Sequence, residues 1–157
     1  MINIKYVWWT LVIIWMAVIF CLSQMDSKSS VGTSNKIVSK TIEKSAEIIN
    51  KHPSEKAVKT ITKKLNYPTR KMAHGVVYIV LTFLVINAFR SSGIKKGLIP
   101  LTLLFCYFYS CTDEIHQLFV GRTGELLDTF IDSIGIVLVL LMYILYNNIK
   151  KKNCYNN

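Results

Sequence analysis

Four long apolar stretches separated by charged residues dominate the pattern along the chain. Asp, Glu, Lys and Arg are absent between Lys5 and Asp26, Lys71 and Arg90, Lys96 and Asp113, and Asp132 and Lys150. Each stretch approaches the ~20 residues that an α-helix needs to cross a bilayer. The pattern therefore predicts an all-α membrane protein, a single domain over residues 1–157, with four transmembrane helices at about 6–25, 72–89, 97–112 and 130–149.

The first apolar stretch follows a short basic start, a pattern that cleaved signal peptides share. The residues before Ser23 are large, among them Phe20 and Leu22, and offer no small-x-small cleavage pattern. We therefore expect residues 6–25 to be retained as a membrane anchor.

Between the first and second stretches, the sequence predicts a loop and then a basic amphipathic helical hairpin at about 35–66. Ser and Thr residues around Gly32 indicate the loop over 27–34. Isoleucines then recur at helical spacing among lysines, His52 and Pro53 interrupt them, and Ser54 is a suitable N-cap for a second helix that Pro68 closes. This hairpin could lie in the membrane interface or form a solvated linker.

The net charge indicates which partners to expect, and the cysteine spacing indicates which disulfides and cofactors to expect. The net charge of +10 comes from lysines that flank and link the apolar stretches, which favours contact with anionic membrane lipids. No basic face is interleaved with aromatic residues, so nucleic acid is not an expected partner. The four cysteines form no C-x-x-C pair, and we expect no disulfide framework, zinc ribbon or other cofactor.

Two ways of counting positive charge predict opposite membrane orientations for this chain. Tight basic clusters at residues 90–96 and 150–152 favour both termini in the cytoplasm. The long first connection and the third connector together hold more Lys and Arg than the other side, which favours the opposite orientation.

Three stretches carry ionisable residues at the ends of the apolar segments. They contain Arg70, Lys71, His74 and Tyr78; then Asp113, Glu114, His116, Gln117 and Arg122; then Glu125, Asp128 and Asp132. If successive helices alternate in direction, all three stretches meet at one membrane surface. Charges near the bilayer centre cost about 2.5–3.5 kcal/mol each, so such groups usually face one another or a polar pocket.

Three interpretations of this cluster stay open from the residues alone. It can be an ion-pair network that only sets helix register. Its cations, Arg70, Lys71 and Arg122, can bind a phosphate or carboxylate while the acids orient them. Alternatively, its His, Asp and Glu residues can bind a divalent metal or act as general acid and base on a lipid-linked substrate.

The same stretches resemble the VanZ-like family of bacterial membrane proteins. The residues that carry the resemblance are TDEIHQLFVGRTGELLDTFIDSIG from Thr112 to Gly135, RKMAHGVVYIVL from Arg70 to Leu81, and FCLSQMDSKSS from Phe20 to Ser30. Departures include Gly75 where an aromatic residue is usual and Val77 where an acid is common. One residue is also missing before Arg122.

The resemblance implies a multi-pass protein of the bacterial cell membrane whose family namesake lowers susceptibility to teicoplanin-type glycopeptide antibiotics. It implies functional roles for Arg70, Lys71, His74, Tyr78, Asp113, Glu114, His116, Gln117, Arg122, Asp128 and Asp132. We therefore expect a protein that binds an anionic lipid, a cell-wall precursor or a lipoglycopeptide. A membrane-embedded enzyme and a non-catalytic envelope scaffold are the alternatives.

Overall fold

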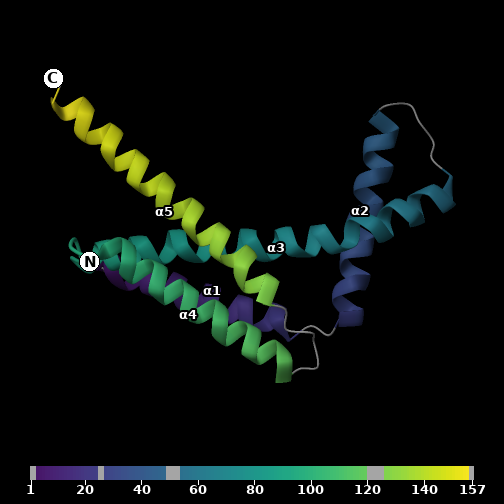
Figure 1. Cartoon of the computed structure of the whole chain (residues 1–157), viewed down its shortest axis with the longest axis horizontal. Coiled ribbons are helices and arrows are strands. Elements are labelled where there is room, and N and C mark those ends of the chain that lie inside the picture. Colours follow the sequence, from purple (N-terminus) through teal and green to yellow (C-terminus); the bar gives the residue numbers. More distant parts are fainter. Residues whose placement is uncertain (1–2, 25–26, 49–53, 120–125, 156–157) are drawn as a thin grey trace.

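The computed structural model describes residues 3–24, 27–48, 54–119 and 126–155, and these residues form α-helices and short connections (Figure 1). The helices are α1 (Ile4–Ser23), α2 (Ser27–Ile48), α3 (Glu55–Ser91), α4 (Leu98–Phe119) and α5 (Leu126–Tyr155). The described part of the chain contains no strand. The prediction of an all-α protein is therefore confirmed.

Among the described residues, three segments are long and apolar enough to cross a membrane: Ile4–Ser23, Lys71–Ser91 and Asp128–Asn153. They correspond to the first, second and fourth predicted spans. The third predicted span, 97–112, forms most of α4, but the last turns of that helix carry Asp113, Glu114 and His116, which lower its mean hydropathy. Three such helices in so short a chain make it a membrane protein.

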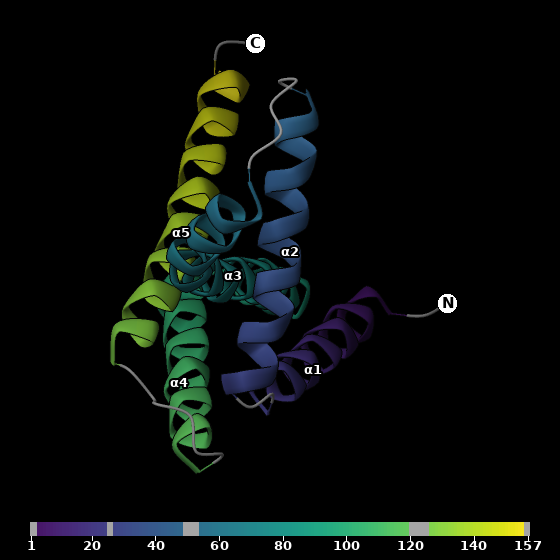
Figure 2. The ribbon, with the colours of Figure 1, turned by 90° about the vertical axis from the view of Figure 1, so that its right-hand side faces the viewer.

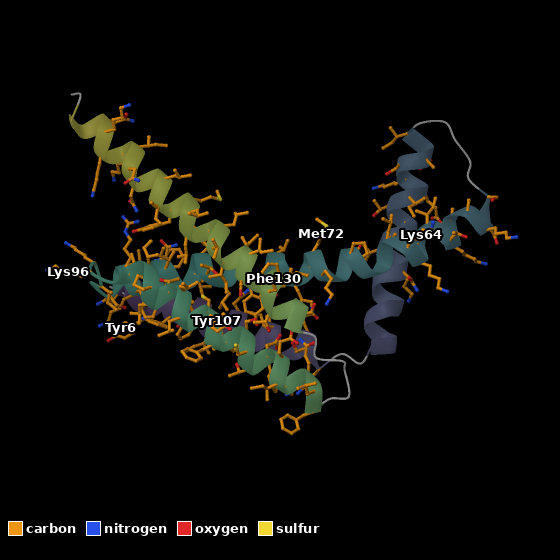
Figure 3. All side chains as sticks on the ribbon, viewed as in Figure 1. Tyr6, Lys64, Met72, Lys96, Tyr107 and Phe130 are labelled. Atoms are coloured by element: carbon orange, nitrogen blue, oxygen red, sulfur yellow. The ribbon has the colours of Figure 1, made fainter. Side chains whose placement is uncertain are left out.

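The distribution of polar and apolar side chains supports this assignment. Large apolar side chains point outward from every spanning segment, including Ile13, Phe83 and Met142. Tyr107 and Phe130, labelled in Figure 3, are exposed as well. Several of the most deeply buried side chains are instead polar. An apolar exterior around a partly polar interior is the arrangement expected where lipid is the solvent.

Successive long helices of the bundle alternate in direction (Figures 1 and 2). Helices α1 and α4 run one way, and α3 and α5 run back. The turn between α3 and α4 uses Gly93 and Gly97, whose φ angles of 86° and 73° lie in the left-handed region that glycine favours. The C-terminal ends of α1 and α4 therefore lie at the same end of the bundle as the start of α5.

Helix α1 is attached to the bundle by hydrogen bonds from aromatic side chains. The Trp15 indole nitrogen donates to the Val77 carbonyl at 3.0 Å, and the Tyr109 hydroxyl donates to the Met16 carbonyl at 2.6 Å. These bonds satisfy polar atoms that would otherwise face hydrocarbon. They set the register of α1 against both α3 and α4.

The region between the first two spans differs from the predicted loop. Residues 27–34 belong to α2, because serine and threonine only weakly disfavour helix and α2 as a whole packs against α3. Val38 of α2 and Thr62 of α3 are buried. Both views show α2 crossing α3 rather than running alongside it (Figures 1 and 2).

Ser54 caps the second helix of the predicted hairpin, which is the start of α3. Its hydroxyl accepts a hydrogen bond from the Ala57 amide at 3.3 Å. Pro68, however, does not end it: α3 continues from Glu55 to Ser91 through this proline. Proline removes one backbone hydrogen bond, and the turns on both sides maintain the helix. The predicted break at His52 and Pro53 lies outside the described residues. The interfacial position of the hairpin stays a prediction.

Helices α3 and α5 approach each other closely at two glycines. A Cβ atom added to Gly135 would lie 2.7 Å from the Gly75 carbonyl oxygen and 3.3 Å from Ile79 Cγ1. A Cβ atom on Gly75 would meet Ile131 Cγ2 at 3.5 Å and the Ile131 carbonyl oxygen at 4.0 Å, both ordinary contact distances. Small residues allow such backbone contact between membrane helices. Here position 135 requires glycine, whereas position 75 has room for a larger side chain.

Gly135→Ala should force α3 and α5 apart and lower the stability of the purified protein by about 1–3 kcal/mol, the usual cost of overpacking. Gly75→Ala, the matched control across the same contact, should leave the melting temperature close to that of the wild type. Thermal unfolding in detergent, followed by circular dichroism, measures both. Equal melting temperatures for the two variants would contradict this packing.

Candidate polar site at one end of the bundle

Residues from four helices form a polar cluster at the end of the bundle where α1 and α4 finish and α5 begins. We define this polar cluster by Ser23 of α1; Lys71, His74 and Tyr78 of α3; Ser110, Asp113, Glu114, His116 and Gln117 of α4; and Asp128 and Asp132 of α5.

An ion pair joins α3 to α5 within the polar cluster. The Lys71 ammonium contacts Asp128 Oδ1, and the two side chains retain only 12% and 10% of their exposed surface. A pair so removed from solvent depends on both partners, because either charge alone would be poorly compensated there. The contact therefore holds the start of the second span against the start of the last.

Hydrogen bonds between hydroxyls and carboxylates join the other helices. The Ser110 hydroxyl donates to Asp132 Oδ2 at 2.7 Å and links α4 to α5. The Ser23 hydroxyl donates to Asp113 Oδ1 at 2.5 Å and links α1 to α4. The Gln117 amide donates to the second oxygen of Asp113 at 3.1 Å. All five side chains are buried.

Some buried polar atoms of the cluster have no hydrogen-bond partner among the described residues. They are Nε2 of His116, the hydroxyl oxygen of Tyr78 and Oδ1 of Asp132. The His116 ring stacks on Phe20 of α1 with centroids 4.4 Å apart. Buried polar atoms in proteins are normally satisfied, so several together favour a site that takes up water or a polar ligand.

The structure brings together residues from all three predicted stretches, but it does not place every one of them. Arg122 and Glu125 lie outside the described residues, and Arg70 lies on α3 with a side chain that is not described. His74 is half-buried on α3 and Glu114 is buried on α4.

Sequence reasoning missed the two serines that bind carboxylates in the polar cluster. Ser23 closes the first apolar stretch, and Ser110 stands three residues before Asp113. A serine at the end of an apolar segment, near an acid in sequence, was the available signal. Serine is too common in membrane helices for this signal to be specific.

The metal interpretation finds no ligand set in the described ranges. No group of three or more His, Cys, Asp or Glu side chains there is arranged to hold a metal ion. Cys21 is exposed, Cys106 is buried and Cys111 is half-buried, and all three are free thiols.

Comparison with known proteins identifies the family. The family model described as VanZ/LLP1 matches residues 8–147, which include every residue of the polar cluster. The chain belongs to the VanZ/LLP1 family. No curated protein and no solved structure matches it. The resemblance found in the sequence motifs is thereby confirmed, and the polar cluster is the part of this VanZ/LLP1 chain where those motifs meet.

Lys71→Met should destabilise the protein by about 3–5 kcal/mol, because it leaves the Asp128 carboxylate buried without its partner. Lys59→Met is the matched control, since Lys59 pairs with Glu55 on the same helix but both side chains are largely exposed. That change should cost less than about 1 kcal/mol. Thermal unfolding in detergent compares the two variants.

The double variant Lys71→Met with Asp128→Leu should recover much of the lost stability, because it replaces both charges by apolar groups. A Lys71 variant no less stable than the Lys59 variant would show that the ion pair does not hold α3 to α5.

Proposed function

We propose that this chain is a multi-pass protein of the bacterial cell membrane whose polar cluster binds an anionic headgroup. The headgroup would belong to a lipid, a lipid-linked cell-wall precursor or a lipoglycopeptide. By binding it, the protein would contribute to teicoplanin and glycopeptide resistance or to envelope homeostasis. The observation that carries the proposal is the shielded Lys71–Asp128 ion pair at one end of apolar helices.

The proposal includes α4 as a fourth span. Its 22 residues extend ~33 Å at 1.5 Å per residue, enough to cross the hydrocarbon layer. The helix runs antiparallel to α3, and its charged residues lie only in its last turns. Four spans place both chain termini on one side of the membrane and the polar cluster on the other.

The basic clusters at residues 95–96 and 150–152 lie at the end of the bundle away from the polar cluster. Figure 3 shows Lys96 at this end and Lys64 at the opposite one. With residues 95–96 and 150–152 in the cytoplasm, the polar cluster faces outward. The tight basic clusters favour this orientation, although the total of Lys and Arg favours the opposite one. Cell-wall precursors and glycopeptides meet the membrane on that outer face.

The chemistry of the cluster suits a phosphate or carboxylate. Asp128 holds the Lys71 ammonium where the helices leave the apolar region, and Arg70 is adjacent in sequence. An anionic group arriving from the headgroup layer would find a cation already oriented by a carboxylate, at a low cost in side-chain entropy. Arg122, in the most specific motif, would add a planar guanidinium that can bind such groups with two hydrogen bonds.

Replacing Arg122 or His116 by Ala should raise teicoplanin susceptibility of an overexpressing strain toward that of cells lacking the protein, because each change removes a group that we assign to the site. Lys44→Ala on the exposed surface of α2 is the control and should leave susceptibility unchanged. Minimum inhibitory concentrations are compared at equal protein levels by immunoblot.

The outcomes separate the proposal from its alternatives. Unchanged susceptibility at unchanged protein level would contradict a binding role for these residues. Loss of the protein in every charge variant would instead favour the scaffold, in which the charges serve folding alone. A stoichiometric metal in the purified wild type, lost on changing His74 or His116, would favour the metal-dependent enzyme.

A further inference from the structure

The inner part of the polar cluster, which we define by Tyr78, Ser110 and Asp132, contains a carboxylate. This carboxylate has no role in binding an anionic ligand. Asp132 lies one helical turn beyond Asp128 on α5, about 6 Å deeper at 1.5 Å per residue. Its side chain has no exposed surface. Oδ2 accepts from the Ser110 hydroxyl at 2.7 Å, and Oδ1 is buried with no donor among the described residues.

The charged groups around Asp132 in the described part of the chain compensate it only in part. Lys71 acts on Asp132 electrostatically, but its ammonium contacts Asp128 one turn away. Asp113 and Glu114 of α4 also act on Asp132, and both are acids that add to the negative potential. A buried carboxylate in such surroundings is stable only when further hydrogen bonds or a positive charge accompany it.

A second buried oxygen, which also lacks a hydrogen bond of standard geometry among the described side chains, lies close to Ser110. Tyr78 of α3 is fully buried, and its hydroxyl oxygen has no hydrogen-bond partner among the described side chains. This hydroxyl interacts electrostatically with Asp132 and Asp113 and neighbours Ser110. Helices α3, α4 and α5 thus each bring one buried oxygen to this point: Tyr78 Oη, Ser110 Oγ and Asp132 Oδ1.

We propose that these three oxygens bind a small exchangeable cation, either Na⁺ or a proton held on the Asp132 carboxylate. Both have a single positive charge and are coordinated by hard oxygen ligands of this kind. A divalent ion typically takes six or more oxygens, several from carboxylates, whereas this point has one unsatisfied carboxylate oxygen. Larger organic cations do not suit a position without exposed surface.

Ionisable side chains inside membrane bundles commonly mark ion or proton sites. The inner cation site goes beyond the proposed function and does not depend on the anionic ligand, because none of its three oxygens belongs to the cations that would bind a headgroup. Its test accordingly uses the ion alone.

The experiment uses the full-length protein in nanodiscs of uncharged-headgroup lipid. One arm measures equilibrium binding of ²²Na⁺ against choline chloride at constant ionic strength. The other arm records infrared difference spectra between acidic and alkaline buffer, in which a carboxylic acid C=O band reports a proton on Asp132. The variants are Asp132→Asn, which keeps the side-chain shape, and Tyr78→Phe, which removes only one oxygen.

For Na⁺, we expect saturable binding that Asp132→Asn abolishes and Tyr78→Phe weakens about tenfold, as for loss of one ligand oxygen. For a proton, we expect no saturable Na⁺ binding and a carboxylic acid band that Asp132→Asn removes and Tyr78→Phe shifts. Glu43→Gln, an exposed acid on α2, should leave both measurements unchanged.

Wild-type protein that neither binds Na⁺ saturably nor shows a titrating carboxylic acid band overturns the proposal. Signals that persist unchanged in Asp132→Asn do so as well. Should Asp132→Asn fail to fold, the wild-type result and the response of Tyr78→Phe decide the question.

Discussion

Polar side chains on apolar helices must satisfy one another, and this requirement organises the end of the bundle that carries them. Hydrocarbon offers no hydrogen bonds, so a carboxylate on a spanning helix is stable only beside a donor or a cation. The structure meets this condition with pairs that cross between helices: Lys71 with Asp128, Ser110 with Asp132, and Ser23 with Asp113. Each pair joins two helices, and together they tie four helices at one end.

Close backbone packing complements these polar contacts. At Gly135 the backbones of α3 and α5 come so near that a Cβ atom would collide with the Gly75 carbonyl. This crossing lies close along both helices to Lys71, Asp128 and Asp132. Beyond it α5 diverges from the rest of the bundle toward the C-terminus (Figure 1). Hydrophobic burial contributes little to helix association in lipid, so short contacts of this kind carry much of the specificity.

The hydrogen bonds and ion pair of the polar cluster also distinguish carboxylates that serve folding from one that can serve function. A charge network that served helix register alone would need each carboxylate satisfied within the protein. Asp128 meets that condition through Lys71, whereas Asp132, one turn further along α5, has an oxygen without a partner among the described residues. The outer and inner parts of the polar cluster therefore differ in chemistry. The outer part presents an oriented cation, and the inner part presents unpaired oxygen acceptors.

The helical class, three of the spans, the Ser54 cap and the family follow from the amino-acid sequence alone. The length of apolar stretches, capping chemistry and the run from Thr112 to Gly135 are local properties of the sequence. It also singled out Lys71, Asp128 and Asp132, since charges at the edge of hydrocarbon are conspicuous. The sequence could not show which acid pairs with Lys71 and which accept a hydrogen bond from a serine hydroxyl. Nor could it show that residues 27–34 join α2 and that α3 continues through Pro68. Those outcomes depend on contacts between residues far apart in the chain, and only the packing of the helices sets their geometry.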